Sequence, residues 1–393
     1  MGSLFIRFAI LTRNGKDAAD YFIKRKISAA HFRTAATESS VTSAGSDPDQ
    51  KPRIDTMENL AVAIGVSRPT LSRYFQDPDR VSRTSRARIE KGLARVDYTP
   101  NFFATRMNRK STGLIGVLIP YLNDLFFTKL QQAIELAAMQ AGFKVLSQSS
   151  HADPAVESRA IGTLASMNVD GAIVVPLGNG TDFEAQSRLN RRLPFVLADS
   201  RPKALSHVDY VGTEHSQSVG LITDYLARMG EPPIFLAMPR VNFNAVNHEN
   251  AYLEKMAELN LPSRVIGTEE IQPGWHYEAH GEAALAEYFA RGELTDASIL
   301  CANDRVAIGA LRAAARFGLS PGSHRRGGLR IAGHDDYPLS QFTVPALTTV
   351  EQNLDAIGAA AVKRLVEKIH GENSGVDHWV KHYPGTLKIR ESA

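Results

Sequence analysis

The feature that most constrains the fold is a long alternation of short apolar runs and amphipathic helical segments that begins at residue 113. The strand-like runs are GLIGVLIP (113–120), FKVLSQ (143–148), GAIVVP (171–176), PFVLA (194–198), PIFLAMP (233–239), RVIG (264–267), SILCA (298–302) and LRIAG (329–333). Helical patterns such as FTKLQQAIELAAMQAG lie between most of them. This alternation predicts βαβ units and parallel sheets. The runs fall into two groups, so we expect two Rossmann-like α/β lobes with a cleft between them.

A different pattern occupies residues 56–96 and predicts three short helices. Thr56 can cap a first helix over MENLAVAI, and Gly65 can end it. Ser67 can cap a second helix over RPTLSRYF, with Pro69 in the first turn, where a missing N–H costs little. The stretch SRTSRARIEKGLARV fits a third amphipathic helix. Three short helices with a glycine turn between the first two form a helix-turn-helix unit.

Charge separates this helical segment from the rest of the chain. The net charge of the 393 residues is only +3. Residues 51–112 hold 13 Lys or Arg and 6 Asp or Glu, whereas residues 113–393 hold 25 and 31. A compact basic segment of this kind binds polyanions by displacing their condensed counterions. The sequence therefore predicts a small cationic head on an acidic body.

Several features bear on the cellular compartment. No run of 18 apolar residues occurs, so we expect no transmembrane helix. The opening LFIRFAIL is short and interrupted by Arg7, which does not fit a secretory signal peptide. Cys301 is the single cysteine, so no disulfide can form within the chain, and it reads as a small buried apolar residue. A cytoplasmic protein is the expectation.

The head and several later motifs together resemble one known family. TMENLAVAIGVSRPTLSRYFQDPDRVSRTSRARIEKGLARVDYTPNFFATRMNRKSTGLIGVLIP is similar to the head of LacI/GalR transcriptional regulators, and DGAIVVP, ANDRVAIGALRAA, GHDD and PALTTVEQN continue the likeness. The resemblance implies a body of the type I periplasmic-binding-protein kind. It also implies a DNA-binding regulator, which we expect to be a repressor whose operator affinity is modulated by a small-molecule effector, most simply a sugar.

On this interpretation the chain divides into four parts. Residues 1–50 are expected to be a disordered leader or an over-long predicted start. Residues 51–98 are the helix-turn-helix domain, residues 99–112 the hinge helix and linker, and residues 113–393 the two-lobed domain for effector binding and dimerisation. We expect a homodimer on double-stranded operator DNA, because one small head makes too few contacts alone, with half-sites about one helical turn apart.

The second helix and the hinge carry the residues expected to contact DNA. Arginine is the commonest reader of guanine in the major groove, which points to Arg68 and Arg73. Thr70 and Ser72 fit contacts to phosphate or sugar, and Pro69 departs from the larger polar residues often found there. The stretch TPNFFATRMNRKS resembles the family's hinge helix. The resemblance implies hinge contacts from Asn101 and Ala104, and a minor-groove wedge from Met107.

The resemblance also implies which residues line the effector pocket. Parallel lobes bind ligands at the carboxyl ends of their strands, and the family's motifs place candidates there. The expected pocket residues are Tyr121, Phe126, Phe127, Ser200, Asn247, Trp275, Asp304 and Gln352. Of these, Trp275 is suited to stack on a sugar face. Asp304 is suited either to accept sugar hydroxyls or to cap the following helix.

Two other classes of protein share parts of this pattern. A sugar-binding receptor for uptake would have the two-lobed body, but it would need an export signal and no basic head. An α/β enzyme would need a catalytic constellation. The chain has no G-x-G-x-x-G and no Walker loop, and HYEAH lacks the Glu that follows the first His of a zinc-protease helix. We therefore expect no enzymatic activity, no cofactor and no metal.

Overall fold

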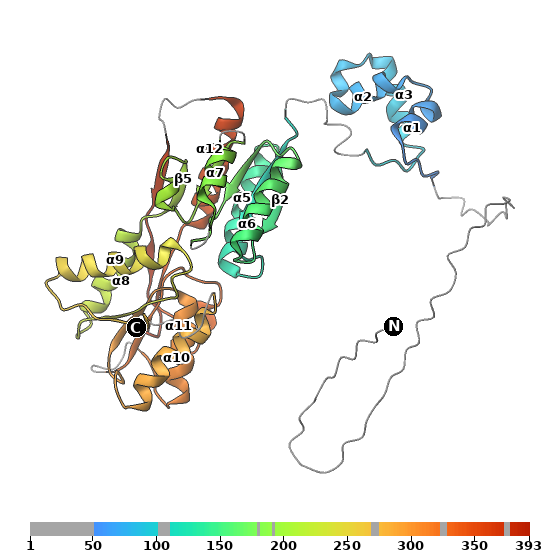
Figure 1. Ribbon diagram of the computed structural model, residues 1–393. Helices are drawn as coiled ribbons and strands as arrows, with labels where there is room; N and C mark the ends of the chain where they lie inside the picture. The colour runs from blue at the N-terminus through green and yellow to red at the C-terminus, as the bar shows by residue number, and fades with distance from the viewer. Residues whose placement is uncertain are drawn as a thin grey trace, which may run out of the picture.

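The computed structural model describes residues 51–100, 111–178, 181–190, 193–268, 275–322, 328–372 and 378–393. These ranges form a helical head and a two-lobed α/β body, which confirms the fold predicted from the sequence (Figure 1). The expected leader lies outside the described residues. So does most of the expected hinge helix, including Asn101, Ala104 and Met107.

The head packs three short helices, α1 (Met57–Ile64), α2 (Arg68–Gln76) and α3 (Arg83–Leu93), with a 3-10 turn, η1 (Pro78–Arg80), before α3. The Thr56 and Ser67 side chains accept hydrogen bonds from backbone N–H groups of the first turns, which confirms both predicted caps. Gly65 ends α1 with a φ of 71°, a left-handed conformation that glycine adopts with little strain. Leu60, Leu71 and Ile89, one from each helix, are fully buried against one another.

The N-terminal lobe has a six-stranded parallel sheet in the order β11-β5-β4-β3-β1-β2. Its strands are β1 (Leu114–Ile119), β2 (Lys144–Ser149), β3 (Gly171–Val174), β4 (Phe195–Ala198), β5 (Tyr210–Thr213) and β11 (Val380–Tyr383). Its helices are α5 (Leu125–Gln140), α6 (Pro154–Ser166), α7 (Phe183–Asn190), η2 (Lys203–Leu205) and α12 (Leu354–His370). Every residue of β1, β3 and β4 is buried, as expected for central parallel strands covered on both faces.

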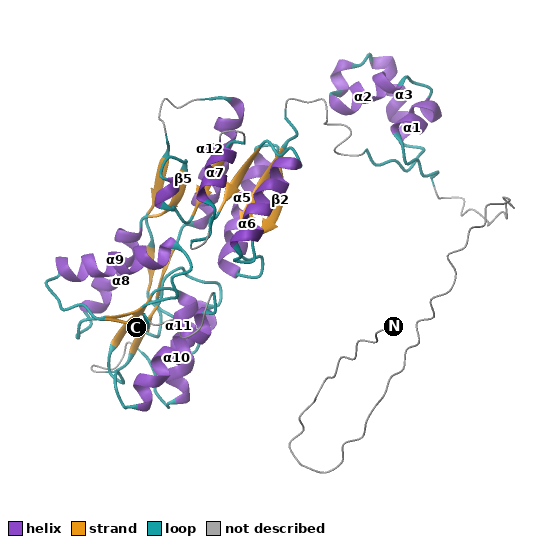
Figure 2. Ribbon diagram, viewed as in Figure 1, coloured by secondary structure: helices purple, strands orange, loops and turns teal. Residues whose placement is uncertain are grey.

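The C-terminal lobe has a smaller parallel sheet in the order β7-β6-β8-β9. Its strands are β6 (Ile234–Leu236), β7 (Val265–Ile266), β8 (Ser298–Cys301) and β9 (Arg330–Ala332). Its helices are α8 (His215–Ala227), α9 (Phe243–Glu258), α10 (Tyr277–Ala290), α11 (Asp304–Arg316) and the short η3 (Ser340–Phe342). Cys301 is fully buried on β8. Figure 2 shows helices against the strands of both lobes. Among the described helices, none is long and apolar enough to cross a membrane.

Three segments of the chain connect the lobes. The first joins β5 to α8, and the second joins β10 (Thr349–Glu351) to α12. The third joins β11 to β12 (Thr386–Lys388), which pairs antiparallel with β10. As a result α12, late in the sequence, packs on α5 and on the sheet of the N-terminal lobe. Three connections allow the lobes to rotate about this region but not to separate.

The sequence pattern predicted eight strands of the body and missed four, β5, β10, β11 and β12. The two that follow α12 are only partly buried, so they lack the continuous apolar character that marks the central strands.

Helices α10 and α11 approach each other closely because each has a glycine at the contact. A Cβ on Gly309 would lie 2.0 Å from the Glu278 carbonyl oxygen, and one on Gly281 would lie 2.1 Å from the Val306 carbonyl oxygen. The contact is therefore backbone against backbone. It fixes the start of α11, which lines the cleft described below.

Replacing Gly309 by alanine should lower the free energy of unfolding by about 1–3 kcal/mol, because the added methyl group forces two backbones apart. The matched control is Gly162→Ala on α6, where no atom lies within 4 Å of the added Cβ. The control should gain roughly 0.5–1 kcal/mol from helix propensity alone. Urea denaturation of both variants checks this, and equal shifts of the same sign would contradict the close packing.

Candidate functional site

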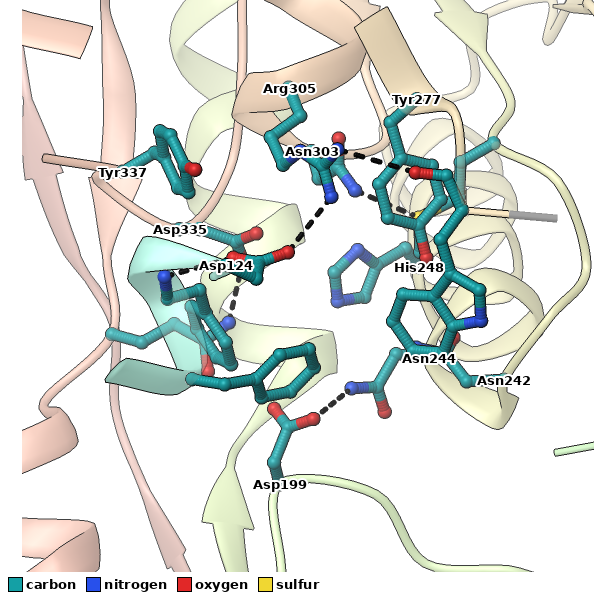
Figure 3. Close-up of a pocket in the computed structure, with 15 residues that line it drawn as sticks. Asp124, Asp199, Asn242, Asn244, His248, Tyr277, Asn303, Arg305, Asp335 and Tyr337 are labelled. Atoms are coloured by element: carbon teal, nitrogen blue, oxygen red, sulfur yellow. Dashed lines mark hydrogen bonds and ion pairs between the residues drawn. The ribbon is translucent and has the colours of Figure 1, made fainter. Parts of the chain in front are cut away.

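A pocket lies between the two lobes, at the carboxyl ends of their strands. Figure 3 shows its side chains converging from both lobes. The lining residues are Asp124, Phe126, Phe127 and Asp199 from the N-terminal lobe, Met238, Asn242, Asn244, His248, Trp275, Tyr277, Asn303, Arg305, Asp335 and Tyr337 from the C-terminal lobe, and Gln352 from a connecting segment. This is the position expected for a ligand site in parallel α/β lobes.

Aromatic rings form one wall of the pocket. The ring centroids of Phe127 and Trp275, which come from opposite lobes, lie 5.9 Å apart. Phe126 and Tyr277 extend this wall on either side. Tyr121 contacts Trp275 edge-on and borders a neighbouring pocket of about 680 Å³. Of the aromatic residues expected in the pocket, Phe126, Phe127 and Trp275 line it, whereas Tyr121 lines only the neighbouring pocket.

Arg305 links the lobes through an ion pair. Its guanidinium lies 2.8 Å from Asp124, which caps α5 of the opposite lobe, and 2.7 Å from Glu278 of its own lobe. Asp124 and the Arg305 side chain are largely buried, so this interaction is screened little by solvent. Burial raises the pKa of Asp124 above its usual value, while the Arg305 charge acts in the opposite direction.

Asp199 and Asn244 form a second contact between the lobes. The amide nitrogen of Asn244 donates to one carboxyl oxygen of Asp199 at 3.1 Å, while the other carboxyl oxygen has no hydrogen-bond partner among the described residues. Asp199 follows β4 directly and has a φ of 65°, a left-handed conformation uncommon for a non-glycine residue. Burial, with repulsion from Asp335, raises the pKa of Asp199 to about 8.

A buried hydrogen-bond network joins the pocket to the connections between the lobes. The amide of Gln352 donates to Asp335 at 2.7 Å, and its oxygen accepts from the hydroxyl of Thr213 at the end of β5. His334 lies 3.0 Å from the same Asp335 oxygen, and its other ring nitrogen lies 2.9 Å from Ser218 on α8. Gln352, a predicted pocket residue that lies on the segment after β10, therefore contacts a second connecting segment at Thr213.

Three histidine rings pack beside this network. His248 places Nδ1 2.8 Å from the Ala302 carbonyl oxygen and Nε2 3.0 Å from Nδ1 of His215. A carbonyl only accepts, so His248 donates from Nδ1 and accepts from His215. Burial lowers the pKa of His248 to about 3 and that of His334 to about 4. Within the described ranges, no group of three or more His, Cys, Asp or Glu side chains is arranged to hold a metal ion.

Three further residues expected in the pocket do not line it. Asp304 is fully buried and accepts from the Tyr337 N–H and from the hydroxyls of Ser340 and Thr349, so both of its oxygens are engaged within the protein. The pocket is lined instead by its neighbours Asn303, which caps α11, and Arg305.

For the other two residues, too, a neighbour in the sequence lines the pocket instead. Ser200 is buried but does not line the pocket, whereas the preceding residue, Asp199, does. Asn247 points to solvent on α9, where Asn244 and His248, four residues apart, face the pocket. That i, i+4 spacing was a readable signal of one helix face. Arg201 does not enter the pocket, since its guanidinium contacts the Ser206 carbonyl oxygen and the Tyr210 ring.

The head presents a second candidate site on α2. Arg68, Pro69 and Arg73 are exposed, while Thr70 and Ser72 are half-buried. The Thr70 hydroxyl lies 2.8 Å from that of Ser67 at the helix cap. Arg68 forms an ion pair with Glu58 of α1, and both side chains are mostly exposed. Exposed ion pairs contribute little to stability, so a phosphate can replace Glu58 as the partner of Arg68 at a small cost in free energy.

Known protein families match both the head and the body of the chain. Residues 56–101 match the family described as bacterial regulatory proteins, lacI family, and residues 223–393 match the periplasmic binding protein-like domain. The chain thus joins a head that matches the lacI family to a body that matches the periplasmic binding protein-like domain. It is 28% identical over 321 residues to the HTH-type transcriptional regulator MalR of Streptomyces coelicolor, covering 80% of this chain and 90% of MalR. It is 26% identical over 346 residues to the HTH-type transcriptional repressor CytR of Escherichia coli K12, covering 81% and 91%.

Solved structures show the same fold for this chain. A lac repressor bound to ONPG matches with a TM-score of 0.74 and 23% identity, covering 86% of this chain and 99% of that one. The transcriptional regulator CelR in complex with cellobiose matches with a TM-score of 0.59 and 22% identity, covering 86% and 99%.

The buried acids and histidines of the cleft predict how stability depends on pH. Asp199 and Asp335 have a pKa of about 8 when folded, so the folded protein retains protons that the unfolded chain loses near pH 4. Below about pH 6.5 the buried histidines oppose this effect, because they take up protons only in the unfolded chain. Above about pH 7 few histidines of the unfolded chain remain protonated, so the acids dominate, and the free energy of unfolding should fall by roughly 1–3 kcal/mol per pH unit.

Denaturant titrations at pH 7, 7.5 and 8 measure this slope. The Asp199→Asn variant should lose about 1 kcal/mol per pH unit of it, since one titrating group is removed. A slope that is absent in the unmodified protein, or unchanged in the variant, would show that these carboxyls ionise normally.

Proposed function

We propose that this lacI-family protein represses transcription by binding operator DNA as a homodimer and that a carbohydrate in the cleft changes its affinity for the operator. The observation that carries the proposal is the surface of α2. Two arginines are exposed there on the second helix of a helix-turn-helix unit whose other face is buried. A helix of this kind enters the major groove with its N-terminal residues toward the bases.

The arrangement of α2 supports distinct roles for its residues. Arg68 and Arg73 can pair with guanine or with adjacent phosphates, because a guanidinium matches both in two-point geometry. Thr70 and Ser72 are half-buried, so they suit contacts to phosphate or sugar. Such contacts fix the register of the helix on the DNA. We assign Asn101, Ala104 and Met107 to contacts with the DNA minor groove. They lie outside the described residues, so their roles rest on the sequence resemblance alone.

The cleft supports a carbohydrate effector. It combines an aromatic wall with carboxylate, amide and hydroxyl groups, which together suit an apolar sugar face and its hydroxyls. Among structural neighbours, CelR is in complex with cellobiose, and a lac repressor dimer is bound to operator and the anti-inducer ONPF. We extend both kinds of ligand, a sugar and an operator, to this chain by analogy.

The two-lobed architecture suggests how the sites communicate. The segment that leads to the head leaves the N-terminal lobe at β1, and Asp124 and Asp199 of that lobe contact the C-terminal lobe across the cleft. A ligand that replaces these contacts rotates the lobe and changes how two hinge segments pair on DNA. A coupling of about 1–3 kcal/mol would change operator affinity roughly 5- to 150-fold. We place this activity in the cytoplasm and assign the protein no catalytic step.

The Arg73→Ala variant tests the DNA-binding surface. It should weaken binding to an operator selected from random duplexes by roughly 30-fold or more, because each of two half-sites loses about 1–3 kcal/mol. Binding to unrelated duplex should change much less. Gel shifts at fixed salt measure both affinities.

The control is Arg228→Ala on α8, which removes the same charge from an exposed position of the body. It should leave both affinities unchanged. If Arg73→Ala retains the full ratio of specific to nonspecific binding, α2 is not the reading helix.

A further inference from the structure

The charges of the pocket restrict the ligands that it can accept. Three carboxyl groups line it, those of Asp124, Asp199 and Asp335. Among the described lining residues the only arginine or lysine is Arg305, which is already paired with Asp124 and Glu278. His248 also lines the pocket, but with a pKa lowered to about 3 it is neutral at physiological pH. An anionic ligand such as a sugar phosphate would therefore find no free positive charge among these residues.

The Asp199–Asn244 contact leaves two acceptors unused. Asp199 is only 3% exposed and Asn244 only 6%. One oxygen of each side chain has no hydrogen-bond partner among the described residues. Figure 3 shows the two side chains facing each other at one end of the pocket. A buried acceptor without a donor costs about 1–3 kcal/mol, so this end of the pocket is suited to a ligand group that donates more than one hydrogen bond.

The aromatic wall of the pocket favours a cation as well. Phe127, Trp275 and Tyr277 present aromatic rings to the same pocket. Aromatic faces attract ammonium groups, most strongly when water is excluded. A single neutral hydroxyl could donate to only one of the two unpartnered oxygens, and it would leave Asp199 protonated. A primary ammonium donates up to three hydrogen bonds, and its charge favours the ionised form of Asp199.

We propose that the effector carries a protonated primary amine, which binds between Asp199 and Asn244 while its hydroxylated ring lies against the aromatic wall. The chemical class is an amino sugar. This inference rests on the proposed function, since it names the kind of carbohydrate that the cleft selects.

The ionisation of Asp199 provides a signature of such a ligand. The groups that face it are Asn244 on α9, Asp335 after β9, Asp124 before α5 and Tyr210 on β5, whose hydroxyl donates to the Asp199 backbone carbonyl. Because these neighbours supply no positive charge, Asp199 is protonated at pH 6.5 in the free protein. An ammonium favours the carboxylate, so its binding should release about one proton. A neutral sugar leaves that proton in place.

Isothermal titration calorimetry of the full chain tests the proposal. The probes are glucosamine, galactosamine and mannosamine, each beside its parent hexose and its N-acetyl form, at pH 6.5 in two buffers that differ in ionisation enthalpy. One of the amines should bind at least about 10-fold more tightly than both neutral partners, and the buffer dependence should report a release of about one proton.

Two variants separate the role of Asp199 from a general effect on folding. Asp199→Asn removes the charge, and asparagine tolerates the left-handed backbone at this position. This variant should lose both the preference for the amine and the proton release. Asp296→Asn, at an exposed position before β8, should retain both. If Asp199→Asn unfolds, the proton release of the unmodified protein still decides the question.

The outcomes that overturn the proposal differ from those that overturn the proposed function. Equal binding of amine and parent hexose, binding without proton release, or binding of none of the three amines each contradicts the amine site. A neutral sugar that changes operator affinity in gel shifts would then leave the proposed function standing. If neither amines nor neutral sugars change operator affinity, the carbohydrate effector itself is wrong.

Discussion

The arrangement of the body depends on one interaction, the ion pair of Arg305 with Asp124 across the cleft. Asp124 also caps α5, and Arg305 lies in the first turn of α11, so the bridge joins the starts of two helices that belong to opposite lobes. The backbone contact between α10 and α11 fixes the position of Arg305 and brings Glu278 into the same cluster. A rotation of one lobe against the other must therefore break or stretch a largely buried charge pair, which is costly unless a ligand replaces it.

Several buried polar groups both line the cleft and bond to the segments that connect the lobes. Asp335, His334 and Gln352 connect it by hydrogen bonds to the segments through which the chain passes between lobes. A ligand that changes the position or charge of these groups acts directly on the region where rotation occurs. The pocket thus needs no long chain of intermediate contacts, because the residues that would touch a ligand also hold the lobes together.

Much of the fold was predictable, and the particular residues show why. Thr56, Gly65 and Ser67 specify the head locally, since caps and a left-handed glycine act within a few residues. The central strands were recognisable because burial on both faces requires continuous apolar sequence. The cleft was placed correctly at the strand ends, but individual pocket residues were not. Whether Asn303, Asp304 or Arg305 faces the cavity depends on Ser340 and Thr349, which lie far along the chain and occupy the Asp304 carboxylate. Local sequence patterns do not contain that information.

The most direct test of this account is a double-mutant cycle on operator affinity without effector, with the unmodified protein, Asp124→Asn, Arg305→Gln and the double variant. If the bridge sets the orientation that the head depends on, each single variant should change the operator dissociation constant by roughly 5-fold or more. The double variant should depart from additivity by about 1 kcal/mol or more. If all four proteins are folded and bind the operator equally, the bridge does not control the head, and the proposed link between cleft and DNA is wrong.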